Sequence, residues 1–151
     1  MAIWQYTFEL IPKDDLEIIG RGNYKGEVDY NNIRFWRNGD YEVGYFDTLT
    51  GLLSKGKSWS NDIVLYGNEE KTCIKFLIED DKISEVVIRI DFREDYSKLL
   101  SEIIEFCGLH ALLLLDEEHN VLPLNQTSII SLIKNSIQYI HLQNLMKNED
   151  S

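Results

Sequence analysis

The chain has few of the features that place a protein in a specialised class. Its 151 residues include only 2 Cys, 2 Pro and 9 Gly, which excludes a disulfide scaffold, collagen and a low-complexity chain. The longest uninterrupted apolar run, from Ala111 to Leu115, is far shorter than the roughly 20 residues needed to cross a bilayer. No basic residue precedes Lys13, so the sequence predicts no secretory signal. We therefore expect a cytoplasmic protein.

Positive charge is also scarce. The chain has 15 Lys plus Arg against 26 Asp plus Glu, a formal net charge of −11. Such a charge repels phosphate backbones and anionic membranes and attracts basic partners. We expect no nucleic-acid or membrane partner, and a basic protein as the partner. The 44% hydrophobic residues are enough, at this length, for one domain spanning 1–151.

Alternating hydrophobicity predicts several strands. From Trp4 to Leu10 the even positions are apolar and the odd ones polar, and Pro12 should end this strand. Glycines punctuate residues 12–60, so this part should be loop-rich, with a turn or two of helix from Lys13 to Ile19. A second brief helix is expected where Asp47 can cap a turn containing Leu49.

Two longer strands, KTCIKFLIE and KISEVVIRIDF, predict a hairpin around a three-residue turn, Asp80 to Lys82. This register places Phe76 opposite Val86 and Ile74 opposite Ile88, with all even positions facing the core. It also brings Lys71 near Asp91 as a cross-strand ion pair. The segment DIVLYG, just before the hairpin, predicts a further short strand.

The C-terminal half predicts helices packed on this sheet. Asp95 should cap a helix with the apolar stripe Tyr96, Leu99, Leu100, Ile103 and Cys107, which Gly108 should end. His110 to Leu115 is apolar on both faces and predicts a strand that is either central or covered by helices on both sides, and Val121 to Leu124 can pair with it. Asn125 or Thr127 should cap a second helix through Ile137, and residues 145–151 should be frayed. The expected fold class is α+β, a mainly antiparallel sheet with helices packed on a face.

Catalytic and metal motifs are weak. The side chains of His110, Asp116, Glu117, Glu118 and His119 are metal-compatible, but their spacing matches no known ligand set, so we interpret them as a solvated turn. Ser58, Ser60 and Asp62 lack a nucleophile elbow, and no glycine pattern completes a phosphate-binding loop. The sequence therefore predicts no catalytic residue, no metal and no cofactor.

Arg89, Asp91 and Arg93 alternate along one strand, so all three share a face of the sheet. Asp91 is able to pair with either arginine. We interpret the three as a structural salt-bridge ladder, and the alternative is that they form the site of a small enzyme.

The segment from Tyr24 to Phe46 combines aromatic and acidic residues at a density unusual for loops. Large amphipathic rings interleaved with carboxylates are typical of an interface with a basic protein. The predicted partner-binding residues are Glu27, Asp29, Trp36, Asp40, Tyr41, Glu42 and Tyr45. The alternative is that these rings cover the core.

Several short segments carry a resemblance. The order SWS (Ser58 to Ser60), LYGNEE (Leu65 to Glu70) and VVIRIDFRE (Val86 to Glu94), after an opening IWQYTFELIP, resembles a group of small bacterial proteins with SWS and IRIDxR segments. In size, acidity and lack of a catalytic motif the chain is also similar to immunity proteins of bacterial toxin systems, including contact-dependent growth inhibition. Neither resemblance assigns a role to a particular residue.

These observations favour a binding protein over an enzyme. The leading hypothesis is an immunity protein that neutralises a basic, nuclease-like toxin by occluding its active surface. The alternatives are a small enzyme acting through the face of Arg89, Asp91 and Arg93, and a structural or oligomer-forming protein without catalysis.

Overall fold

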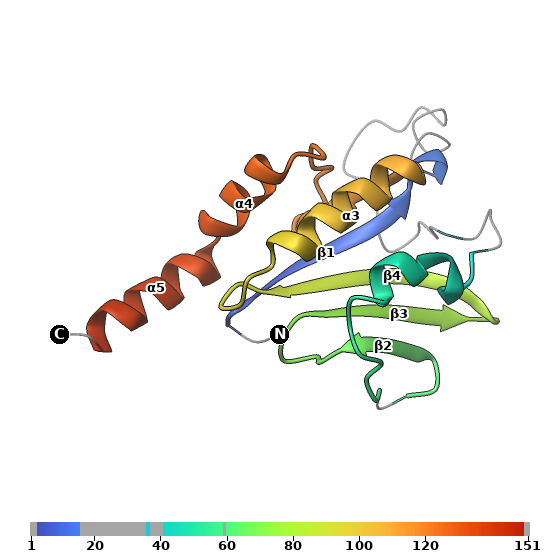
Figure 1. Ribbon diagram of the computed structural model, residues 1–151, viewed down its shortest axis with the longest axis horizontal. Helices are drawn as coiled ribbons and strands as arrows, with labels where there is room; N and C mark the ends of the chain where they lie inside the picture. The colour runs from blue at the N-terminus through green and yellow to red at the C-terminus, as the bar shows by residue number, and fades with distance from the viewer. Residues whose placement is uncertain (1–2, 16–35, 37–40, 59, 150–151) are drawn as a thin grey trace.

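A five-stranded antiparallel sheet forms the centre of the protein (Figure 1). The computed structural model describes residues 3–15, 36, 41–58 and 60–149. The strands are β1 (Gln5–Pro12), β2 (Ile63–Gly67), β3 (Cys73–Glu79), β4 (Lys82–Asp91) and β5 (Leu112–Leu115). Their order in the sheet is β2-β3-β4-β1-β5, so the first strand of the chain pairs with two late ones. The α+β class is confirmed.

The helices in the described part of the chain are the short η1 (Val43–Phe46) and α2 (Asp47–Thr50), followed by α3 (Ser97–Leu109), α4 (Gln126–Lys134) and α5 (Ile137–Glu149). Figure 1 shows α2 and α3 lying over the strands, while α4 and α5 extend beside β1 toward the C-terminus. The prediction of helices packed on a face is confirmed.

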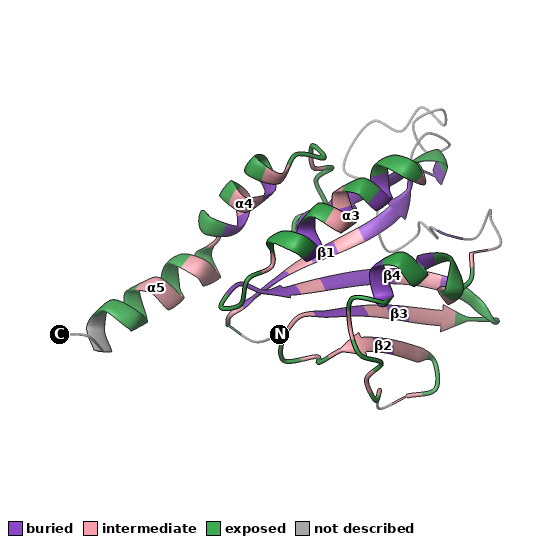
Figure 2. Ribbon diagram, in the orientation of Figure 1, coloured by how far each residue is buried: buried purple, intermediate pink, exposed green. Residues whose placement is uncertain are grey.

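The covered face carries the core, and most of the strand residues that supply it are even-numbered; the odd-numbered ones are Ile11, Ile83 and Leu115. Phe8, Ile74, Phe76, Val86 and Ile88 are all at most 1% exposed, as the purple strands of Figure 2 illustrate. Aromatic rings from the helices complete the core: the centroid of the Phe46 ring lies 5.0 Å from that of Phe76 and 5.3 Å from that of Phe106. The period of two in the sequence therefore identified the buried face correctly.

The predicted hairpin register is confirmed, although the predicted turn is wrong. Ile74 pairs with Ile88 and Phe76 with Val86 as expected. The turn has two residues, Asp80 and Asp81, both with positive φ (53° and 63°), the backbone geometry of a tight hairpin turn. A register shift next to Leu77 leaves Ser84 as an extra residue in β4. This bulge restores the register that a three-residue turn would have given.

Several predicted ends of elements need correction. Gly108 lies inside α3, which continues to Leu109 and is followed by Ala111 with a positive φ of 51°. Asp95 precedes the helix, and its carboxylate accepts a hydrogen bond from Ser97 N at 3.0 Å. The helix therefore continues past Gly108, because Ala111, not the glycine, takes the left-handed conformation that ends helices.

The predicted central strand is an edge strand. Among the described strands β5 pairs with β1 alone, and Leu122 lies along its outer edge, where its N–H donates to Leu114 O at 2.8 Å. Val121 forms a bridge with Leu115, so the expected pairing of Val121 to Leu124 is limited to this short contact.

The predicted second helix is two helices. Asn125 caps α4, since its side chain accepts from Ser128 N at 3.1 Å, as expected. The helix then breaks after Lys134, and α5 begins at Ile137, which is 86% exposed instead of core. α5 is helical to Glu149, whereas the sequence predicted fraying from residue 145.

Candidate functional site

The predicted aromatic and acidic surface is only partly described. Glu27, Asp29 and Asp40 lie outside the described residues. Trp36 is 1% exposed: its indole N–H donates to Leu10 O at 3.1 Å and its backbone N–H to the Asp15 carboxylate at 2.8 Å. The prediction that Trp36 contacts a partner is therefore wrong. An indole with a satisfied N–H serves the core better than the surface.

Three other predicted residues lie between this core and solvent. The Tyr41 ring meets Trp36 edge to face at 4.9 Å and Tyr45 at 5.2 Å, and burial raises the pKa of its hydroxyl. Tyr45 is 38% exposed, and its hydroxyl lies 2.9 Å from His110 Nδ1. Glu42 is exposed. Only Glu42 and Tyr45 of the predicted set are thus described as accessible to a partner.

Asp91 and Arg93 form a structural contact. Asp91 is fully buried, and both its carboxylate oxygens accept from the Arg93 guanidinium, at 3.0 and 2.8 Å. The same guanidinium lies 4.0 Å above the Trp4 ring. Since the Asp91 oxygens are paired in this way, the expected Lys71–Asp91 ion pair is not formed. Lys71 lies outside the β3–β4 ladder, which begins at Cys73.

Arg89 does not join this contact. It pairs across the sheet with Cys73 on β3 and Thr7 on β1. Its Nε is buried without a hydrogen-bond partner among the described residues. The prediction that all three residues share one strand is therefore wrong, because β4 ends at Asp91 and Arg93 lies in the turn that follows it. The three residues of the enzyme alternative do not converge on one reacting position.

A hollow of about 370 Å³ on the opposite face of the sheet from α3 is the candidate site. Carboxylates dominate its lining. The residues around it are Thr7, Phe8, Glu9, Glu85, Val87, Asp116, Glu117 and His119. They come from β1, from β4 and from the turn that follows β5.

Sheet pairing brings the first two carboxylates together. Glu9 lies opposite Val87, so Glu85, two residues along β4, is on the same face of the sheet as its diagonal neighbour. Glu117 closes the hollow: its Oε2 accepts from Thr7 N at 3.1 Å and its Oε1 from Gln138 Nε2 at 2.8 Å. The hollow is therefore fixed by backbone pairing and by α5.

The turn after β5 is held by Asp116. Its carboxylate accepts from Glu118 N at 2.9 Å and from Asn120 N at 2.8 Å. Within this turn His119 has a positive φ of 65°, an uncommon conformation for a residue other than glycine. His119 Nε2 then lies 3.7 Å from Glu9 Oε2.

The hollow places a carboxylate where its charge is poorly solvated. Burial, and to a lesser extent the charge of Glu85, raises the pKa of Glu9 from 4.5 to about 7. Two like-charged side chains on one face favour a cation between them, because a positive group offsets both desolvation and repulsion. The arrangement is therefore suited to accept an ammonium or guanidinium group.

Other predicted features have structural roles. Ser58 Oγ lies 2.6 Å from Ser60 O and 2.6 Å from Ile63 O, so it orders the turn before β2. In the described part of the chain, no group of three or more His, Cys, Asp or Glu side chains is arranged to hold a metal ion. None of the helices described there has both the length and the apolar character that crossing a bilayer requires.

The sequence places Glu9 on the polar side of a strand and predicts a solvated turn from Asp116 to His119, but it does not indicate that these residues lie together. The residues of the hollow lie together because β1 lies between β4 and β5 in the sheet, and no local signal in the sequence indicates this strand order.

Comparison with known proteins adds no relative. No family model matches the chain, and the searches of curated proteins and of solved structures gave no match.

Proposed function

We propose that the protein is a cytoplasmic binding module for a basic protein and, more specifically, an immunity protein that neutralises a nuclease-like toxin by occlusion. The observation that carries this proposal is the hollow in which Glu9 and Glu85 share one face of the sheet. A lysine or arginine side chain of the partner enters it and lies between the two carboxylates.

Charge supports this choice of partner. The chain has a net charge of −11, and a basic nuclease surface is complementary to it. Long-range attraction steers the two proteins together before contact. Val87 provides an apolar wall in the hollow, against which the methylene stem of a lysine or arginine packs.

In this proposal Glu42 and Tyr45 form a second, smaller contact with the basic partner. Both are exposed, and a tyrosine ring provides contact area at low entropic cost. Trp36 lies in the core, so Glu42 and Tyr45 are the described residues of the predicted surface that remain available for this contact.

The test begins with capture of a partner from the native host, using wild-type protein and Glu85→Lys as baits. Glu105→Lys is the matched control, because Glu105 is an exposed residue of α3, on the other face of the sheet. We expect a basic protein on the wild-type and control baits and its loss on Glu85→Lys.

Kinetics with the captured partner then test the mechanism. Association should slow as ionic strength rises toward 0.15 M, where the screening length falls to about 8 Å. Glu85→Lys should reduce the affinity at least about tenfold, since a cation then meets a cation. A captured partner that is acidic, or equal binding of Glu85→Lys and wild type, would contradict the proposal.

A further inference from the structure

The carboxylates around the hollow differ in their hydrogen bonds. That of Asp116 accepts from two backbone N–H groups and from Asn120 Nδ2 at 3.2 Å. That of Glu117 accepts from Thr7 N on one oxygen and from Gln138 Nε2 on the other. The oxygens of these two side chains are therefore occupied by donors of the protein itself.

Glu9 has no such donors. Its side chain is only 17% exposed, and among the described residues the one basic group within 4 Å is His119 Nε2, at 3.7 Å from Oε2, which is longer than a hydrogen bond. Glu85, its diagonal neighbour on β4, adds a second negative charge. An anion at Glu9 is unfavourable, because it has lost water and is repelled by Glu85. Without a partner, the hollow therefore favours a proton on Glu9.

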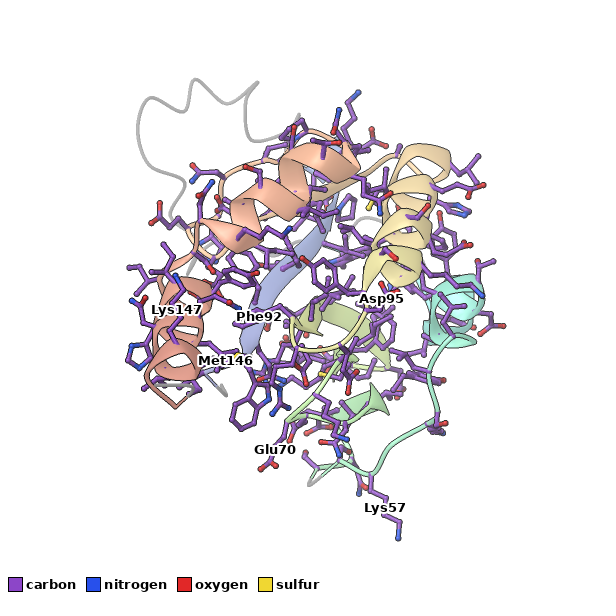
Figure 3. All side chains as sticks on the ribbon, turned by 60° about the vertical axis from the view of Figure 1, so that its left-hand side comes forward. Lys57, Glu70, Phe92, Asp95, Met146 and Lys147 are labelled. Atoms are coloured by element: carbon purple, nitrogen blue, oxygen red, sulfur yellow. The ribbon has the colours of Figure 1, made fainter. Side chains whose placement is uncertain are left out.

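The lysines and arginines of the described part of the chain do not line the hollow. Arg89, the neighbour of Glu9 in the other direction along β4, lies outside it, and Lys75 on β3 pairs with Glu69. Lys57, labelled in Figure 3, points away from the body of the protein beside β2, the strand at the far edge of the sheet. These side chains therefore leave Glu9 to a cation that comes from a partner.

A proton and a cation compete for Glu9, because each neutralises the same carboxylate. We propose that binding of a basic partner at the hollow is coupled to the loss of a proton from Glu9, so that the complex is tight above neutral pH and weakens in acid. The O–H bond of the Glu9 carboxyl group breaks, the proton passes to water, and the cation of the partner takes its place. This inference rests on the proposed function, since it takes a lysine or arginine of the partner as the occupant.

The size of the effect follows from the two protonation equilibria of Glu9. Its pKa is about 7 without a partner, and contact with a cation lowers the pKa of a carboxylate by roughly 1–3. The partner therefore binds at full strength above pH 7 and loses affinity as the pH falls below it. Between pH 8 and pH 6 the affinity should fall about five- to tenfold.

NMR titration with a defined probe tests this coupling in the whole protein. The probe is N-acetyl-arginine amide, and N-acetyl-citrulline amide, which has nearly the same shape without the charge, is the matched control at equal ionic strength. The carboxyl carbon of Glu9 should titrate near pH 7 in the protein alone. The arginine probe should move this titration to lower pH, and the citrulline probe should leave it in place.

The dissociation constant of the arginine probe, from the amide shifts of Thr7 and Val87, should be about five- to tenfold higher at pH 6 than at pH 8. Glu9→Gln should bind the probe equally at both pH values, because it has no proton to lose. His119→Asn, which also tolerates a positive φ, should keep the pH dependence of wild type, and circular dichroism checks each fold.

The outcomes separate this inference from the proposed function. Binding of the arginine probe with the same affinity at pH 6 and pH 8, or titration of Glu9 near 4.5 in the protein alone, overturns the inference and leaves the proposed function standing. Loss of the pH dependence in His119→Asn overturns it as well, because the proton would then belong to His119. Failure of the arginine probe to shift any residue of the hollow at pH 8 contradicts the proposed function itself.

Discussion

The two faces of the sheet are built from alternate residues of the same strands and differ in almost every property. The even face is dry, with Phe8, Ile74 and Phe76 at most 1% exposed beneath α2 and α3. The odd face carries Glu9, Glu85 and Arg89, all partly exposed. One face is occupied by packing contacts, and the other is left with charged groups available to a partner.

The odd face is itself divided. At one end the loop after β2 folds over it, and the buried Gln5 side chain donates to Glu69 O at 2.7 Å and to Lys71 O at 2.5 Å. At the other end lies the carboxylate-lined hollow. Stability should therefore depend on the even face and on the closed end of the odd face, and binding on the hollow.

The largest effect should come from the even face. Phe76→Ala should lower the free energy of unfolding by about 3–5 kcal/mol, because it leaves a cavity among close-packed rings. Lys75→Ala, one residue along β3, should cost less than about 1 kcal/mol, since its ion pair with Glu69 at 3.4 Å is weak. Urea denaturation of both variants measures the difference. A larger cost for Lys75→Ala would mean that the faces are assigned the wrong way round.

A smaller but clear cost is expected at the closed end of the odd face. Asp91→Ala should destabilise the protein by on the order of 1–3 kcal/mol, because the buried carboxylate accepts from the Arg93 side chain and from Arg93 N at 2.9 Å. Asp62→Ala, an exposed carboxylate before β2, is the control and should be almost neutral. Equal thermal midpoints for the two variants would show that the Asp91 contact does not hold this end.

A substitution in the hollow should stabilise the protein, unlike the two above, and the gain should depend on pH. The folded protein holds a proton on Glu9 up to about pH 7, compared with 4.5 for an ordinary glutamate. The contribution of Glu9 is therefore fully present below pH 4.5 and is lost as pH rises through 7. Glu9→Gln should stabilise the protein by about 1 kcal/mol at pH 8, after allowance for solvent screening, and leave it unchanged at pH 4.

Chemical denaturation of wild type and Glu9→Gln at pH 4, 6 and 8 measures this effect. Glu79→Gln is the control, because Glu79 is an exposed residue at the end of β3. A gain that is the same at all three pH values would indicate a packing effect and not the titration of Glu9.

The smallest effect concerns the turn that joins the two central strands. Asp81 has a φ of 63°, which glycine adopts without strain. Asp81→Gly should therefore stabilise the hairpin by about 0.5–1 kcal/mol, whereas Glu79→Gly, within β3, should destabilise it. The thermal midpoints of the two variants measure this. A loss of stability in Asp81→Gly would argue against a two-residue turn.

The fold was predicted well where a local sequence pattern, such as strand alternation or a helix cap, is enough to decide the structure. Alternation in the two hairpin strands predicted the register of Phe76 with Val86 and the buried face, and Asn125 was one of the two residues predicted to cap the second helix. The errors arose where tertiary contacts decide the outcome. Ala111 takes the conformation expected of a glycine, and β5 lies at an edge that Val121 and Leu122 cover.

The candidate site was predicted less well. Trp36 was assigned to the surface because amphipathic aromatic residues are common in interfaces, and nothing local distinguishes such a ring from one whose N–H bonds to Leu10 O. The hollow depends on contacts between residues more than 70 positions apart, such as Glu9 with Glu85 and with His119. Only the strand order brings them together.

The extra residue at Ser84 has a consequence for how this sequence can change over time. A strand normally tolerates no single-residue insertion or deletion, since every following side chain would exchange faces. Here the bulge absorbs one residue between the hairpin tip and the paired residues from Glu85 onward. The tip can therefore vary in length while Glu85 stays in the hollow and Val86 in the core. Related chains should accumulate their length differences at this end of the hairpin.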